Sequence, residues 1–71
     1  MAESVIAPMV GKVFRVECKV GDSVEEDQVL FVLEAMKMEI PVMAPASGHV
    51  KEIKVAVGDT VEADMVLAII D

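Results

Sequence analysis

The chain carries one sequence pattern twice, and the second copy follows the first at a constant offset of 37 residues without a gap. Thirteen of the 30 positions in residues 5–34 are identical to their counterparts in residues 42–71. Each copy contains an Ala-Pro pair, a Val-Gly-Asp unit and a Val-Leu pair. A repeat this short cannot bury an apolar face alone, so the two copies must share one core. The repeat therefore predicts a fold with quasi-two-fold symmetry.

One lysine lies between the two copies. Lys37 has no counterpart, because the positions 37 residues before and after it fall outside the 71-residue chain. In a two-fold arrangement the connection between the copies lies at one end and the two termini lie at the other. We therefore expect a single domain over 1–71, with repeat halves 5–34 and 42–71 and a tip hairpin over 35–41 that presents Lys37.

The apolar residues predict an all-β fold. Valine and isoleucine dominate them, and β-branched residues suit half-buried strands. Short apolar runs alternate with turn signals, and no segment keeps a 3.6-residue period. In each Val-Gly-Asp unit we expect a tight turn whose aspartate bonds to amides that follow it. The predicted strands are Val5–Ile6, Lys12–Val16, Val24, Val29–Glu34, Met38–Met43, His49–Val55, Val61 and Val66–Ile70.

The segment from Val29 to Val42 must contain a chain reversal. Its 14 residues would span about 46 Å as one strand. A domain of this length has a diameter of only about 29 Å. The midpoint of the segment places the reversal at Ala35 to Lys37. Tight hairpin turns favour Asn-Gly or Asp-Gly, so Met-Lys breaks the local rule, as residues at functional sites do.

Composition excludes several classes of partner. The formal net charge is −7, and the chain has two phenylalanines and no tyrosine or tryptophan, which argues against nucleic acids and anionic lipids. No apolar run reaches the ~18 residues of a membrane span. The lone Cys18 and the absence of an apolar N-terminal signal predict a cytoplasmic protein. Cys18 aligns with Val55, which predicts a small buried hydrophobe, and His49 aligns with Lys12, which predicts exposure.

The hexapeptide Glu-Ala-Met-Lys-Met-Glu at 34–39 resembles the biotin attachment sequence of biotin carrier domains in biotin-dependent carboxylases, decarboxylases and transcarboxylases. The two Ala-Pro turns, the two Val-Gly-Asp units and the midway lysine also match this biotinyl/lipoyl attachment family, so the resemblance covers essentially the whole chain. The resemblance implies a flattened β-barrel, or barrel-sandwich hybrid, of two four-stranded antiparallel sheets with quasi-two-fold symmetry.

The resemblance also implies a carrier rather than an enzyme. Lys37 would hold biotin in amide linkage, attached by a biotin protein ligase, with Glu34, Ala35, Met36 and Met38 as ligase-recognition residues. The carrier would shuttle a carboxyl group between the sites of biotin carboxylase and carboxyltransferase (or decarboxylase) subunits. We find no catalytic acid, base or metal site, and we expect the domain itself to be monomeric.

Alternatives remain at this point. A lipoyl carrier shares the fold but usually has an Asp-Lys-Ala-like sequence, and Met36 and Met38 argue against it. The chain could also be an unmodified structural module, its methionines could be core residues, or Met-x-Met could bind a soft metal. Glu34 and Glu39 could serve recognition or simply be solvated. The gapless repeat leaves no room for a thumb insertion, so the chain resembles thumb-less carriers, either free-standing or cut from a longer chain.

Overall fold

The computed structural model describes all residues from Met1 to Asp71, which form eight β-strands and no helix. Consequently no helix is present that could span a bilayer. The strands are β1 (Glu3–Ile6), β2 (Gly11–Val16), β3 (Ser23–Val24), β4 (Val29–Ala35), β5 (Met38–Met43), β6 (Gly48–Ile53), β7 (Thr60–Val61) and β8 (Val66–Ile70).

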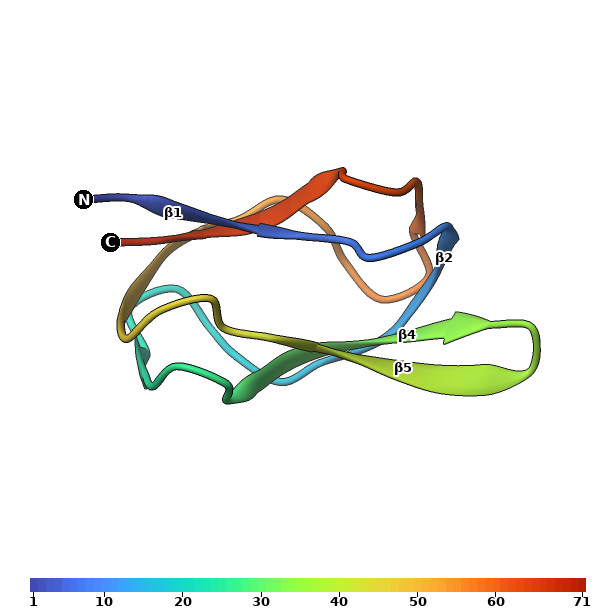
Figure 1. Ribbon diagram of the computed structural model, residues 1–71, viewed down its shortest axis with the longest axis horizontal. Helices are drawn as coiled ribbons and strands as arrows, with labels where there is room; N and C mark the ends of the chain where they lie inside the picture. Colours follow the sequence, from blue (N-terminus) through green and yellow to red (C-terminus); the bar gives the residue numbers. More distant parts are fainter.

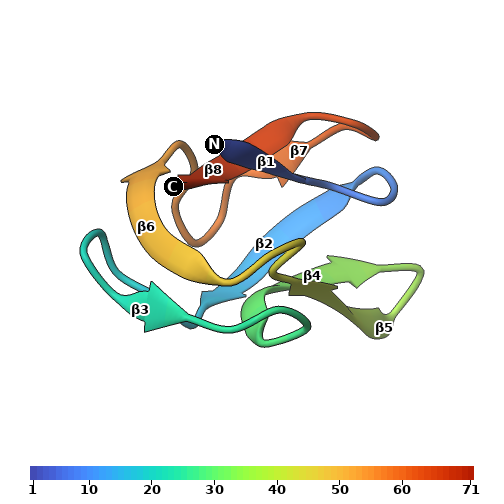
Figure 2. The ribbon, with the colours of Figure 1, turned by 60° about the vertical axis from the view of Figure 1, so that its left-hand side comes forward.

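The strands form two four-stranded antiparallel sheets, with the orders β1-β8-β6-β3 and β5-β4-β2-β7. Replacing every strand by its counterpart in the other copy converts the first order into the second, which is the expected quasi-two-fold relation. The sheets face each other as a flattened barrel (Figures 1 and 2). The predicted all-β barrel-sandwich fold is therefore confirmed.

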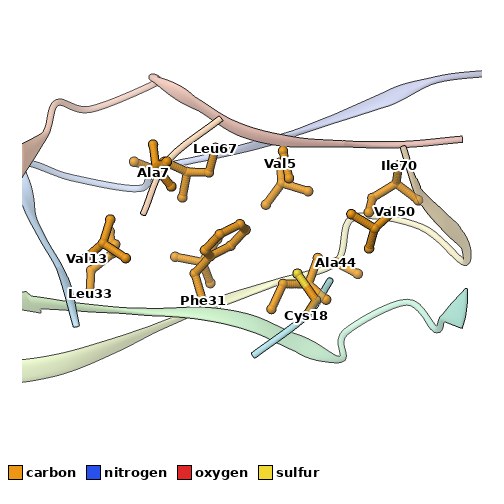
Figure 3. Packing of buried hydrophobic residues seen from close by; sticks show 14 of the residues in the cluster. Val5, Ala7, Val13, Cys18, Phe31, Leu33, Ala44, Val50, Leu67 and Ile70 are labelled. Carbon is orange, nitrogen blue, oxygen red and sulfur yellow. The ribbon is translucent and has the colours of Figure 1, made fainter. Parts of the chain in front are cut away.

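The core lies between the sheets and is entirely apolar. Sixteen buried side chains form one cluster, and no polar or charged residue is buried. Figure 3 shows the ring of Phe31 reaching from one sheet toward Val5 and Leu67 of the other. Burying a side chain of this size contributes roughly 1.5–3 kcal/mol. Cys18 belongs to the same cluster, so its prediction as a small buried hydrophobe is confirmed.

The sixth strand is shorter than predicted. We expected it to run to Val55, but β6 ends at Ile53. The Lys54 amide still donates to the Leu67 carbonyl at 2.8 Å, after which the chain leaves β8. Val55 points into the core but forms no hydrogen bonds to a neighbouring strand. Its apolar side chain suggested a strand residue, although burial here does not depend on strand pairing.

The Val-Gly-Asp turns are built as tight turns, but the aspartate bonds in the direction opposite to the prediction. The Asp22 carboxylate accepts from the amide of Lys19, three residues earlier, at 2.8 Å. Asp59 does the same for Ala56 at 2.9 Å. Gly21 has a φ of 95°, which turns the chain back so that Asp22 meets the residues before it.

The β4–β5 hairpin and the two termini lie at opposite ends of the molecule (Figure 1). The molecule measures 33 × 17 × 16 Å, and the hairpin and termini mark the two ends of its long axis. A partner joined to the termini would therefore leave the hairpin end open.

Candidate functional site

The turn between β4 and β5 consists of only two residues. Ala35 pairs with Met38 as the last rung of the ladder, which leaves Met36 and Lys37 as the turn. Their φ angles are 52° and 63°, the positive values that a type I′ turn requires. Left-handed backbone costs an L-residue roughly 1–2 kcal/mol. The fold thus retains two unfavourable residues at its apex.

The side-chain amine of Lys37 is accessible to solvent at this apex. Its side chain is exposed, and it takes part in no hydrogen bond or ion pair with the rest of the chain. The neighbouring methionines are also exposed, Met36 by 82% and Met38 by 61%. Side chains so open to water do not fill gaps in the core, so that alternative is wrong. Glu34 is exposed and Ala35 is half-buried at the start of the turn.

The two glutamates that flank the turn have different surroundings. Glu39 lies 3.5 Å from the guanidinium of Arg15, which also lies 3.3 Å from Glu17 and stacks over the Phe14 ring at 5.4 Å. Glu34 forms no ion pair. Exposed pairs contribute about 0–1 kcal/mol, so Arg15 mainly keeps Glu39 against the sheet. Glu34 is the flanking carboxylate that remains free.

No group of three histidine, cysteine, aspartate or glutamate side chains lies close enough together to hold a metal ion. Cys18 is buried in the core, and burial raises the pKa of its thiol. His49 is exposed on β6, as predicted. The chain's one cysteine and one histidine therefore lie away from Met36 and Met38, Cys18 inside the barrel and His49 on the other sheet.

A groove that the sequence did not reveal lies beside the hairpin. The backbones of β2 and β4 approach so closely there that a Cβ on Gly11 would lie 3.0 Å from the Glu34 carbonyl oxygen. The groove is open to solvent and has a volume of about 330 Å³. The residues that line it are Met9, Val10, Gly11, Lys12, Glu34, Ala35, Met36 and Thr60. Lys37 is not among them, but its neighbour Met36 is.

Residues 3–70 match a protein family described as "Biotin-requiring enzyme". The chain is 53% identical over 38 residues to the biotin carboxyl carrier protein of Streptococcus mutans, a match that covers 54% of this chain and 29% of that protein. It is 48% identical over 42 residues to biotinylated protein TB7.3 of Mycobacterium tuberculosis, which covers 59% of each. The matches thus cover 29% and 59% of the lengths of these two relatives.

Solved structures also resemble the fold, in one case over the full chain. The urea carboxylase of Kluyveromyces lactis superposes with a TM-score of 0.94 at 37% identity. The match covers 100% of this chain and 6% of that chain. The same barrel therefore occurs as one small part of a much larger protein.

Proposed function

The chain belongs to the biotin-requiring enzyme family and is a biotinyl domain of that family, and on this basis we propose that Lys37 is the residue to which biotin is attached. The observation that carries the proposal is the exposed, unpaired amine at the apex of a two-residue turn. Lys37 also lies at the end of the molecule opposite to the termini. The other lysines lie on the barrel body, within the repeat copies.

Attachment is an acyl transfer to Lys37. The Nζ atom attacks the acyl carbon of a biotinyl adenylate, an amide bond forms, AMP leaves and the amine loses a proton. The formal net charge of the chain goes from −7 to −8. Met36 and Met38 supply exposed apolar surface on both sides of the amine, which suits recognition by a biotin protein ligase. The ligase brings the catalytic groups, and this chain brings an accessible nucleophile.

The loaded domain acts as a carrier. Attached biotin supplies a ureido nitrogen that takes up and releases a carboxyl group. The chain itself holds that group on a flexible side chain, at a rigid hairpin end that points away from its own termini. Tethering gives effective concentrations in the millimolar range at nearby sites. We propose a biotin carboxylase and a carboxyltransferase or decarboxylase as the two partners that the carrier serves.

A ligation assay tests the attachment site. The protein is incubated with a biotin protein ligase, biotin and ATP, and intact mass and streptavidin blotting follow the product. We expect one biotinyl adduct on the wild type, none on Lys37→Ala, and an undiminished adduct on the matched control Lys19→Ala, which removes an exposed lysine on the barrel body. Label that survives Lys37→Ala would disprove the site. A lipoyl adduct on protein from its own host would disprove the assignment to biotin.

A further inference from the structure

The two copies differ at the bend that precedes β2 and β6. Residues 8–10 and 45–47 form the same three-residue bend, and a glycine follows in each copy. The first copy has Met9 and Val10, whereas the second has Ala46 and Ser47. Val10 is 58% exposed, so the fold gains little from its apolar side chain. Small and polar residues serve the same bend in the second copy, so the bend itself does not require the apolar side chains of Met9 and Val10.

These two residues line the groove beside the hairpin, together with Met36. Its volume of about 330 Å³ lies at the low end of small-ligand pockets, which begin at about 300 Å³. Lys12 and Glu34, opposite each other in the β2–β4 register, also line it. Neither forms an ion pair, so both retain unused hydrogen-bonding capacity. The groove thus combines an apolar wall with one free donor and one free acceptor.

A group on Lys37 can reach this groove. Glu34 lies three residues before Lys37, a distance of at most about 10 Å along the chain. A biotinyl lysine places about ten single bonds between its Cα and the ring, or about 12 Å at the spacing of an extended chain. The length of the arm therefore matches the distance from the apex to the groove.

Building on the proposed attachment at Lys37, we propose that this groove is a resting seat for the bicyclic ring of the biotin carried by the same chain. The sulfur-containing side of the ring packs against Met9 and Val10. The ureido N–H groups suit the Glu34 carboxylate, and the ureido carbonyl suits the Lys12 ammonium. A partner's active site must then bind the ring more tightly than the groove does, which favours transfer only at a matching site.

NMR of the methionine and valine methyl groups of the intact chain tests the seat, with full attachment first established by mass. Met9 lies far from Lys37 in the sequence, so cross-relaxation between its methyl group and the ring protons reports contact with the ring rather than the bond to Lys37. We expect the signals of Met9 and Val10 to move on biotinylation and to show cross-relaxation with ring protons. We expect the signal of Met65, which does not line the groove, to stay in place. Lys37→Gln controls for the loss of charge.

The decisive variant exchanges Met9 and Val10 for the residues of the second copy. Met9→Ala with Val10→Ser keeps a bend that this chain already tolerates, and Val20→Ser at the opposite end is the matched control, since Val20 is 63% exposed. Because the exchange removes the Met9 and Val10 methyl groups, the readout in this variant is the methyl group of Thr60, which also lines the groove. We expect its cross-relaxation with the ring protons to be lost in the exchange and preserved in the control. Full attachment with unmoved Met9 and Val10 signals, or the same shifts in Lys37→Gln, would overturn the seat. Failure to attach biotin at all would instead overturn the proposed function.

Discussion

Met36 and Lys37 hold left-handed backbone conformations that neither residue type favours. Asparagine adopts this conformation readily, so Met36→Asn should stabilise the fold by about 1 kcal/mol. For a domain of this size that gain raises the melting temperature by about 4–8 °C. The same change removes apolar surface beside Lys37, so the rate of biotinylation should fall. Thermal unfolding and a ligation time course measure the two effects.

Met38→Asn is the matched control for this prediction. Met38 is also exposed and also borders Lys37, but it lies in β5 and has no positive φ. Asparagine is unfavourable in strands, so this variant should gain no stability. Equal stabilisation by both variants would show that the turn is not strained. A rate of biotinylation unchanged in both would show that the methionine side chains do not contribute to recognition.

Cys18 makes stability depend on pH. Burial raises the pKa of its thiol above the ordinary value of 9.0, and the nearby charge of Asp22 raises it further. The unfolded chain therefore loses this proton at a lower pH than the folded chain does. Its contribution to stability is complete below about pH 9 and is lost as the pH rises through the folded pKa. We expect the denaturant midpoint to decline in that range.

Cys18→Val tests the origin of that decline. Valine occupies the same place in the second copy, at Val55, so the variant retains a packed core. The other titratable groups are common to both proteins, so the difference between the two pH profiles isolates the thiol. An identical decline in Cys18→Val would contradict the prediction.

Among the elements, β2 and β4 approach each other closely at Gly11. A Cβ at this position would lie 3.0 Å from the Glu34 carbonyl oxygen, and β4 is held on both sides by β2 and β5. Gly48 is its counterpart, but the backbone atom nearest to a Cβ there belongs to Asp71, 3.1 Å away, an exposed residue that lies beyond the end of β8. Gly11→Ala should therefore cost about 1–3 kcal/mol, and Gly48→Ala should cost less. Denaturant unfolding of both variants decides the order, and a larger loss for Gly48→Ala would contradict it.

The elements also show what the sequence could predict. Repeat register, turn signals and β-branched runs located all eight strands, because each depends on local pattern. The irregularities depend on the partner strand and were not predictable. In β4, Leu30 sits at a register shift against β5 and is buried together with Phe31. Val32 is also buried, although it lies outside the core cluster and is paired with Arg15 and Pro41 on the neighbouring strands. Because residues on both faces of β4 are buried, its sequence is a continuous apolar run rather than an alternating one.

At the candidate site, too, the features set by local sequence were predictable and those set by contacts between distant segments were not. The length of the segment from Val29 to Val42 placed the reversal, and the structure has its turn at Met36 and Lys37 within that range. The groove was missed because it forms only when the bend at Met9 comes beside the hairpin. The sequence did contain a signal for it, namely the apolar pair at this bend where the second copy has Ala-Ser. A comparison of the two copies at positions where one has an apolar pair and the other has small or polar residues would have pointed to the groove.

At the scale of the whole molecule, each sheet takes two strands from each copy. Residues 5–34 alone hold β2 and β4 of one sheet but lack β5 and β7, and the other sheet is equally incomplete. The two halves must therefore fold together. This exchange of strands also fixes the ends of the barrel, because the connection between the copies and the chain termini must emerge at opposite ends.

That polarity predicts where a fused protein interferes with ligation. A folded protein fused to Met1 or Asp71 lies at the far end of a 33 Å long axis and should leave the rate of biotinylation unchanged. The same protein inserted after Met9 lies beside the hairpin and should slow ligation at least tenfold, about 1.4 kcal/mol in the barrier. Insertion after Ala46 uses the equivalent bend near the termini, so it controls for damage to the fold, which circular dichroism also monitors. If the terminal fusions or the insertion after Ala46 slowed ligation as much as the insertion after Met9, the barrel would not separate the end that holds the termini from the end that is biotinylated.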